Sequence, residues 1–435
     1  MSDSTLNWRR IATDILLVAG SGTLRKLINY AVIVALARYL HKDDIGAFFF
    51  AASLAAIASL VSEFGTSNHL VRQVASAPER ATVVVSQVLA VRLPLMLVSA
   101  SALMLIAWVF YPDILTTVAL TIAYVFLDSL ALTSCAVLVA LKRVRERITA
   151  DILTRIVLLA LIFAAIGYDA GFEAILVAYG VANLLFAAAA LWLLRVHTGR
   201  IHVMEGYRGS VGVLRVSLSF FILMALAVLH FKIDTVMLGA MASLEAVATY
   251  EIAYRCLEVS RFVIRPLNTI FLPLCTGLVA RQAWPDLRML VGRLLFGTVI
   301  VAVAIGALVA YNADAIIELI FGADYRSSAP ILQVLFLSLP AVYLAFVGSV
   351  LANTLYLEKR MIAVMAACLV TNVLANFYAI PRWGPLGAAW TTVLTETLLA
   401  VWVVTMVVRE LKHVGTARSK AARAVRTYDG VVDEA

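Results

Sequence analysis

Long apolar runs, each about the length needed to cross a membrane, recur along the whole chain. A helix needs about twenty mostly apolar residues to span a bilayer. Twelve runs meet this length: 14–40, 46–69, 82–110, 115–141, 149–168, 172–195, 214–240, 245–279, 288–312, 328–356, 361–380 and 385–409. Short polar segments separate them. The sequence therefore predicts an all-α, polytopic membrane protein with about twelve transmembrane helices.

The composition of the chain agrees with this prediction. Hydrophobic residues make up 63% of the chain and charged residues 14%, whereas soluble domains have roughly 45–50% and about 25%. A soluble protein of 435 residues has no interior large enough for this apolar excess. The net charge of +8 does not indicate nucleic acid, because the basic residues lie at the ends of apolar runs and form no separate basic domain.

Signatures of metal binding and of catalysis are missing from the sequence. The four cysteines all fall within apolar runs, without CxxC or Cys/His spacing, so we predict neither a metal site nor a disulfide framework. The chain has no nucleophile elbow, Walker A sequence or HExxH motif. We therefore expect no enzyme activity and no cofactor.

The distribution of basic residues predicts how the helices are oriented. Arg and Lys are concentrated in alternate connections, above all in 142–147, 195–215 and the tail 413–435, whereas the opposite loops are mostly acidic. The positive-inside rule places the basic side in the cytoplasm. We expect a multi-pass protein of the cell membrane with both termini and a basic tail in the cytoplasm.

The two halves of the chain have related patterns. A shift of about 200 residues aligns LARYLHKDDIGAFFFAA, which starts at Leu36, with LGAMASLEAVATYEIAY, which starts at Leu238. An acidic turn residue, a β-branched residue and an aromatic residue recur in both segments. This predicts two pseudo-symmetric lobes of six helices around a central cavity, 1–200 and 201–412, an arrangement typical of transporters.

Charged residues inside the apolar runs are candidates for function. Each costs about 2.5–3.5 kcal/mol on insertion scales, so such residues normally face a wet cavity or a partner. In the eighth run, five charges fall within one arc of roughly 120° of a helix: Glu251, Arg255, Glu258, Arg261 and Arg265. Pairing among these charges at i, i+3 and i+4 is the alternative interpretation.

Further intramembrane charges lie in other runs. The first run carries Arg25 and Lys26, the seventh carries Lys232 and Asp234, and isolated charges occur at Glu63, Arg92, Asp128, Asp151, Arg155 and Glu396. Together these residues predict a cavity lined mainly by the first helices of each half. Its net positive charge indicates an anionic substrate.

Two stretches resemble polysaccharide flippases of the Wzx type, members of the multidrug/oligosaccharidyl-lipid/polysaccharide exporter superfamily. The segment Leu36–Ala75 is similar to the family's opening pattern across its first two helices, and Lys232–Arg255 is similar to the matching pattern at helices seven and eight. Ala248 and Thr249 stand where related sequences often have glycine, which leaves the subfamily open.

The resemblance implies a flippase that moves an undecaprenyl-pyrophosphate-linked oligosaccharide outward by alternating access, for polysaccharide, O-antigen or exopolysaccharide synthesis. It implies a cationic lumen made of Arg25, Lys26, Arg92, Lys232, Arg255, Arg261 and Arg265. Coupling or counter-ion roles would fall to Glu63, Asp128, Asp234, Glu251 and Glu258. The expected partners are the lipid-linked glycan, membrane lipids and a polysaccharide polymerase or ligase.

Two other functions stay open at this point. A cation-coupled multidrug exporter of the same superfamily would carry acidic residues in its N-terminal cavity, where this chain has Arg25 and Lys26. A membrane-embedded glycosyltransferase or polymerase would be expected to have a large extracytoplasmic loop, and the predicted loops here are short.

Overall fold

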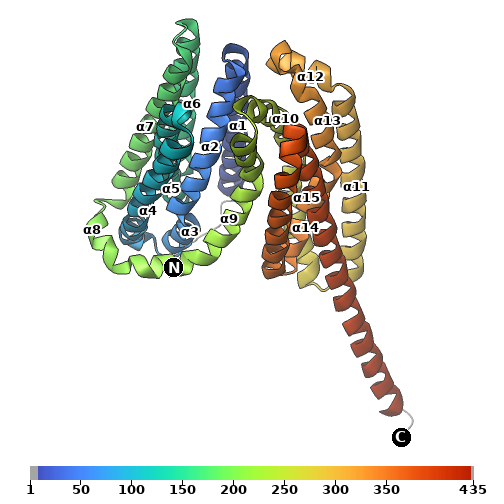
Figure 1. Cartoon of the computed structure of the whole chain (residues 1–435). Helices are drawn as coiled ribbons and strands as arrows, with labels where there is room; N and C mark the ends of the chain where they lie inside the picture. The colour runs from blue at the N-terminus through green and yellow to red at the C-terminus, as the bar shows by residue number, and fades with distance from the viewer. Residues whose placement is uncertain (1–7, 433–435) are drawn as a thin grey trace. The chain divides into compact units, whose positions relative to one another are not determined.

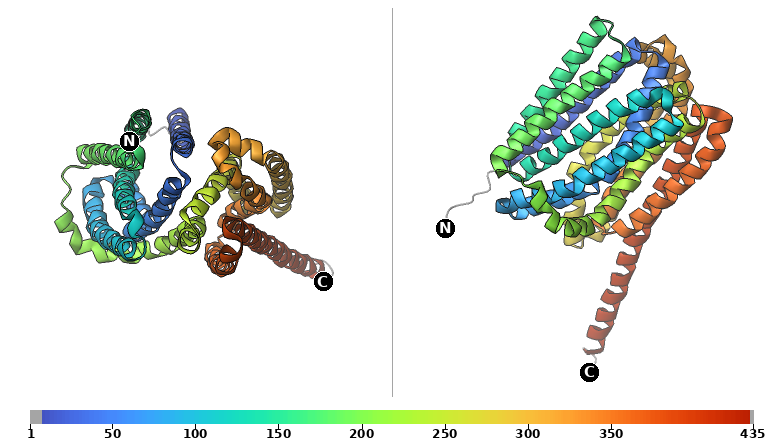
Figure 2. Two further views of the ribbon diagram at one scale, coloured as in Figure 1. Left: turned by 45° about the horizontal axis from the view of Figure 1, so that its top comes forward. Right: turned by 60° about the vertical axis from the view of Figure 1, so that its left-hand side comes forward.

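The computed structural model describes the backbone of residues 8–432 and the side chains of residues 20, 22–207, 209–264, 267 and 270–412. Within these residues the chain is helical, without strands, so the all-α prediction is confirmed. Its Cα packing defines two compact units, Met1–Ala248 and Thr249–Ala435. Each unit is a bundle of long helices that run roughly alongside one another (Figures 1 and 2).

The first unit is built around α2, α5 and α7. Its helices are α1 (Trp8–Tyr39), α2 (Lys42–Glu63), α3 (Thr66–Ser76), α4 (Ala81–Phe110), α5 (Leu115–Ala140), α6 (Val144–Gly167), α7 (Gly171–Thr198), α8 (Val203–Gly206) and α9 (Ser210–Met241). Helix α2 packs against α4, α5 and α9, α5 packs along α7, and α1 packs on α6. Small and branched apolar side chains fill the contacts. The expected lobe boundary near residue 200 stays a prediction; α9 belongs to the first unit because it packs along α2.

The second unit contains the remaining helices. They are α10 (Leu244–Ala280), which begins in the first unit, α11 (Trp284–Tyr311), α12 (Ala313–Phe321), α13 (Ala329–Leu337), α14 (Leu339–Thr354) and α15 (Glu358–Val432). Helix α14 packs along α15, and α11 packs on α13 and α14. Tyr343 donates a hydrogen bond to the Ser260 carbonyl at 2.7 Å, which ties α14 to α10.

Helix α15 is a hairpin of two helices joined at Gly384, which has φ 53° and ψ −134°. Thr391 Oγ1 donates to Asn376 Oδ1 at 2.5 Å across the hairpin. In a straight helix these two residues would be about 22 Å apart. The hairpin therefore supplies the two spans predicted at 361–380 and 385–409.

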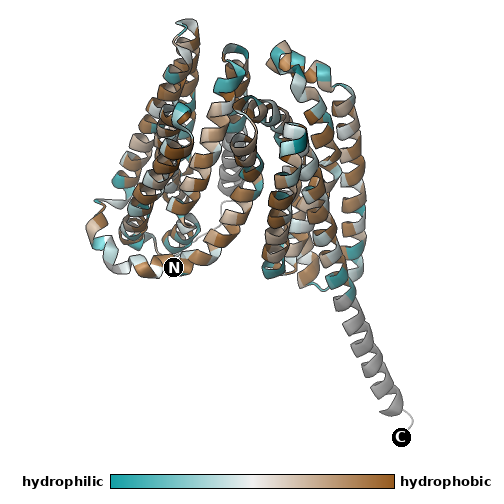
Figure 3. Cartoon of the chain, in the orientation of Figure 1, coloured by the Kyte–Doolittle hydropathy of each residue, from teal (hydrophilic) through white to brown (hydrophobic). Residues whose placement is uncertain are grey.

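The described residues contain eight helices that are long and apolar enough to cross a membrane, and a ninth span if a bent pair counts as one. The α15 hairpin contributes two spans to the predicted total, and α1 and α10 have the length of a span but carry several charges. Apolar residues extend along most helices (Figure 3), and large side chains such as Leu97 and Phe296 are exposed. Such exposure is expected where lipid replaces water.

Two predicted spans differ in detail from the structure. The run 46–69 divides into α2 and α3 because Phe64 and Gly65 both adopt left-handed conformations, with φ of 44° and 66°, which a right-handed helix cannot continue. The run 328–356 is a broken pair, the segment Ala323–Leu337 and the helix α14, bent by 44°. Pro340 lies in the first turn of α14, and proline lacks an N–H and crowds the preceding turn.

Candidate functional site

A cluster of four charged side chains lies inside the first unit, on α1, α5 and α6. Arg25 on α1 donates to both carboxylate oxygens of Asp128 on α5, each at 3.1 Å. Arg155 on α6 donates to the same carboxylate at 3.0 Å. Asp151, one turn before Arg155, lies 3.5 Å from the Arg155 guanidinium and 3.8 Å from that of Arg25. The two arginines are therefore balanced by two aspartates.

This first-unit cluster has a buried side and an exposed side. The side chains of Asp151 and Arg155 are 4% and 5% exposed, whereas those of Arg25 and Asp128 are 21% and 24% exposed. A carboxylate that is nearly dry must stay with its counter-charge, because an unpaired buried charge is costly. Asp128 has part of its surface free for another contact.

A cavity of about 220 Å³ lies beside Asp128 in the first unit. Glu63, Ser67, Arg92 and Ser129 contribute polar groups to its wall, and apolar residues of α2, α5 and α9 complete it. Arg92 is only 1% exposed; it donates to the hydroxyls of Ser129 at 2.6 Å and of Thr133. The Ser67 hydroxyl donates to Glu63 at 2.6 Å. This cavity thus has carboxylates as well as an arginine.

A second cluster lies on α10, in the second unit. The Arg255 guanidinium donates to Glu251 at 2.8 Å and to Glu258 at 2.7 Å. These contacts have the i, i+4 and i, i+3 spacing that the sequence indicated. Arg261 donates to Glu396 of α15 at 3.0 Å. The charge balance therefore includes a residue from another helix, which the pattern within α10 alone could not indicate.

The α10 cluster repeats the arrangement of the first unit. Its central arginine bridges a dry carboxylate, Glu251, which is 1% exposed, and a wetter one, Glu258, which is 35% exposed. In the first unit Arg25 also lies between a dry and a wetter carboxylate, but it donates both hydrogen bonds to the wetter Asp128 and lies 3.8 Å from the dry Asp151.

Three residues outside the predicted site complete these clusters: Asp151, Arg155 and Glu396. The sequence marks each of them as a charge within an apolar run. Their partners become visible only when helices are brought together, because Glu396 is 135 residues from Arg261. Sequence reasoning therefore found the charged groups but did not assign their partners.

The other predicted site residues occupy α1, α9 and α10. Lys26 is half-buried next to Arg25 on α1. On α9, Lys232 is half-buried and Asp234 is buried. The side chain of Arg265 lies outside the described residues. Their roles in substrate binding or coupling stay predictions.

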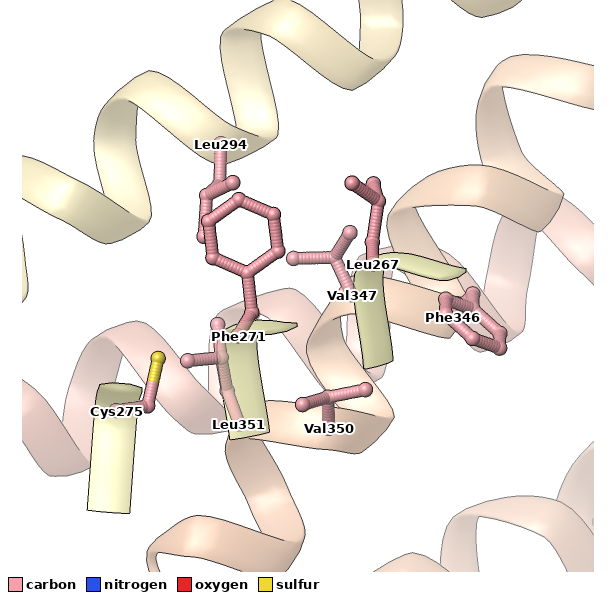
Figure 4. Close-up of a pocket in the computed structure, with 8 residues that line it drawn as sticks. All are labelled: Leu267, Phe271, Cys275, Leu294, Phe346, Val347, Val350 and Leu351. Carbon is pink, nitrogen blue, oxygen red and sulfur yellow. The ribbon is translucent and has the colours of Figure 1, made fainter. Parts of the chain in front are cut away.

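A small cavity of about 10 Å³ in the second unit contrasts with these polar sites. Its walls are formed by side chains of α10, α11 and α14, among them Phe271, Leu294 and Val350 (Figure 4). The Cys275 thiol is the most polar group in this wall. None of the residues that line this cavity is charged, so it has no group to bind an ion. We interpret it as a packing gap between helices.

Comparison with known protein families shows to which family the chain belongs. The model of the family described as "polysaccharide biosynthesis protein" matches residues 11–278, more than half of the sequence. The chain belongs to this family. The match includes both charge clusters except Glu396, and it agrees with the Wzx-type resemblance of the segments that start at Leu36 and Lys232. This polysaccharide biosynthesis family member is a multi-pass membrane protein.

A curated relative and several solved structures resemble this family member. An uncharacterised membrane protein of Methanocaldococcus jannaschii is 24% identical over 184 residues, which are 42% of this chain and 36% of the relative. The chain thus matches about a third of the length of that relative.

The similar structures extend over nearly the whole chain. An inward-facing multidrug resistance MATE family transporter has a TM-score of 0.71 and 14% identity, with 93% of this chain and 99% of that chain covered. The lipid II flippase MurJ in an inward closed conformation has a TM-score of 0.72 and 14% identity, with 95% and 93% covered. A transporter from Pyrococcus furiosus has a TM-score of 0.62 and 16% identity, with 93% and 95% covered. The fold is that of the multidrug/oligosaccharidyl-lipid/polysaccharide exporter superfamily.

Proposed function

We propose that this protein is a flippase that moves an anionic lipid-linked oligosaccharide from the inner to the outer leaflet of the cell membrane. Family membership and the transporter fold support this proposal. The observation that carries it is the arginine in each unit that bridges a dry and a partly exposed carboxylate. The proposed substrate class is an undecaprenyl-pyrophosphate glycan, because a guanidinium can bind its phosphate oxygens in place of a carboxylate.

The chemistry of the step is an exchange of anions. A pyrophosphate carries about two negative charges, and these are costly to bring to mid-membrane depth without counter-charge. On their dry sides Arg255 donates a hydrogen bond to Glu251 at 2.8 Å, and Arg25 lies 3.8 Å from Asp151. The pyrophosphate would take the place of Asp128 and Glu258 on the wetter sides, and guanidinium binds phosphate oxygens with two parallel hydrogen bonds. Alternating access would then carry the headgroup through the predicted central cavity.

The orientation of the helices is part of the proposal and gives a direct prediction. Single cysteines at Arg200 and at Lys412, in a variant without the four native cysteines, should react with a permeant maleimide only. Cysteines at Asp169 and Asp324 should react with an impermeant one added to whole cells. This follows from the positive-inside rule. Outside labelling at Lys412 would contradict both the orientation and the two-lobe arrangement.

Removal of the two bridging arginines tests the transport function. The Arg25→Ala and Arg255→Ala variants should each lose complementation of a flippase-deficient strain while their membrane levels stay normal. Arg255→Lys should recover part of the activity, because lysine keeps the charge but cannot form two parallel hydrogen bonds. Arg326→Ala is a matched control, since Arg326 is an exposed arginine far from these clusters in sequence.

A charge swap separates binding from simple ion pairing. If Arg255 only balances Glu251, then Glu251→Arg combined with Arg255→Glu should restore function. The proposal expects no recovery, because the swap moves the guanidinium by one turn, about 6 Å, from the substrate. Full activity of the Arg25→Ala, Arg255→Ala double variant would contradict the proposal.

The cavity beside Asp128 favours a second candidate, a cation-coupled multidrug exporter. Glu63 and Asp128 both line this cavity, and carboxylates suit a cationic substrate or coupling ion. This candidate predicts that Glu63→Gln with Asp128→Asn abolishes resistance to cationic drugs, while Arg25→Ala does not. Accumulation of a lipid-linked glycan in cells without the protein would favour the flippase instead.

A further inference from the structure

A polar cavity in the first unit is lined by none of the residues of the first-unit charge cluster. It has a volume of about 300 Å³ and is bounded by α3, the start of α4 and the start of α9. Polar walls come from His69, Gln73, Arg80 and Gln87. The Gln87 amide fits beside Gly209 only because glycine has no Cβ, since a Cβ there would lie 2.2 Å from the Gln87 side-chain nitrogen.

The polar side chains that line this cavity have hydrogen-bond donors available for a ligand. Among the described side chains, Gln73, Arg80 and Gln87 form no hydrogen bond or ion pair through their side chains. The His69 imidazole offers at least one ring N–H donor in either protonation state. Glu79 neighbours Arg80 in sequence but does not line the cavity. The lining residues therefore carry one positive charge and several amide or imidazole donors.

The apolar part of the lining comes from the ends of two membrane helices. Val83 and Val84 stand in the first turn of α4, and Val213 and Val216 in the first two turns of α9. Val83 and Val216 are each 53% exposed. Helix ends of spanning length lie at the level of the lipid headgroups, so an acyl chain can cover these valines while a headgroup enters the cavity.

We propose that this cavity binds an anionic phospholipid, with its phosphate at Arg80, Gln73 and Gln87 and an acyl chain along Val83 and Val216. Phosphate accepts charge-assisted hydrogen bonds from guanidinium and further ones from amides. A headgroup without a cationic substituent keeps its net negative charge opposite Arg80. Such a lipid contacts α3, α4 and α9, three helices of the first unit that also pack against one another. The site is separate from the proposed transport function.

Two variants of the whole protein test this site by different means. Arg80→Gln removes the charge, and Gly212→Leu fills the cavity, since a side chain at Gly212 meets no atom within 4 Å. Their matched controls are Arg200→Gln, which removes a basic residue outside the cavity, and Gly297→Leu on α11, where the space is also open. Native mass spectrometry of the detergent-purified protein would measure binding of phosphatidylglycerol, of phosphatidylcholine and of inorganic phosphate.

The wild type and both controls should retain phosphatidylglycerol in preference to phosphatidylcholine. Arg80→Gln and Gly212→Leu should each weaken phosphatidylglycerol binding about tenfold, the effect of losing about 1.4 kcal/mol of binding. Unchanged binding in Arg80→Gln, whose exposed position makes misfolding no concern, would overturn the proposal. Equal retention of the two lipids would do so as well. Binding of inorganic phosphate that displaces phosphatidylglycerol would assign the cavity to free phosphate instead of lipid.

Discussion

Replacement of Arg155 by methionine is expected to lower the melting temperature of the protein by roughly 5–15 °C, because it leaves Asp151 buried with too little counter-charge. Arg155 and Asp151 are nearly dry and lie one turn apart on α6. Removal of one partner of a buried pair costs about 3–5 kcal/mol, since the remaining charge is left in a medium of low dielectric constant. Methionine fills most of the volume of the arginine, so the packing against Phe186 is largely kept.

The double variant Asp151→Leu, Arg155→Met is the decisive comparison. It removes both charges, and apolar replacements of buried pairs are often neutral for stability. We expect its melting temperature to return to within a few degrees of the wild type. Tryptophan-fluorescence melting in detergent would measure both variants.

An exposed arginine provides the control for this experiment. Arg326 lies 3.8 Å from Glu318 at the surface, and an exposed pair contributes about 0–1 kcal/mol. Arg326→Met should therefore change the melting temperature little. If Arg155→Met were as mild as Arg326→Met, the first-unit cluster would not be buried as described.

The apolar runs and the charges inside them could be read from the sequence because each depends on local composition. Helices α4, α5, α7 and α9 begin and end within a few residues of the predicted spans, since hydrocarbon thickness sets their length. The break at Phe64 and Gly65 was missed. Its left-handed residues are fixed by packing on α9, where the Phe64 ring stacks on Phe221 with centroids 4.5 Å apart.

The charge balance of the site could be read from the sequence only where both partners lie on one helix. The pairs of Arg255 with Glu251 and Glu258 agree with the alternative interpretation of the helical spacing. The sequence also suggested an excess of arginine, because the charges were counted within each apolar run separately. Asp128 and Glu396 supply their charge from other helices, and which helices meet is a property of the tertiary fold.

The second large effect is expected at Gly46, where α2 meets the turn between α9 and α10. A Cβ built on Gly46 would lie 1.9 Å from the Leu244 carbonyl oxygen and 2.5 Å from its carbon. These are backbone atoms, so no side chain can rotate away to make room. Near the residue one turn after Gly46, a Cβ on Gly239 of α9 would lie 2.2 Å from the Phe50 ring. Gly46 therefore lets two backbones touch, and Gly239 lets a ring lie against a backbone, as small residues do at other membrane helix contacts.

Gly46→Ala should therefore force α2 away from this turn and cost about 1–3 kcal/mol, the range for overpacking. In a transporter this cost falls on the conformation in which the two segments touch, so export in the complementation assay should drop by about tenfold or more.

Lys42→Ala is the informative comparison, since Lys42 pairs with Glu245 at 3.0 Å beside the same contact. That pair is exposed and contributes about 0–1 kcal/mol, so its loss should be mild. Gly180→Ala, on α7 where a Cβ meets nothing within 4 Å, should be neutral or slightly stabilising. Full export in Gly46→Ala together with an unchanged melting temperature would mean that this contact is not formed in the working protein.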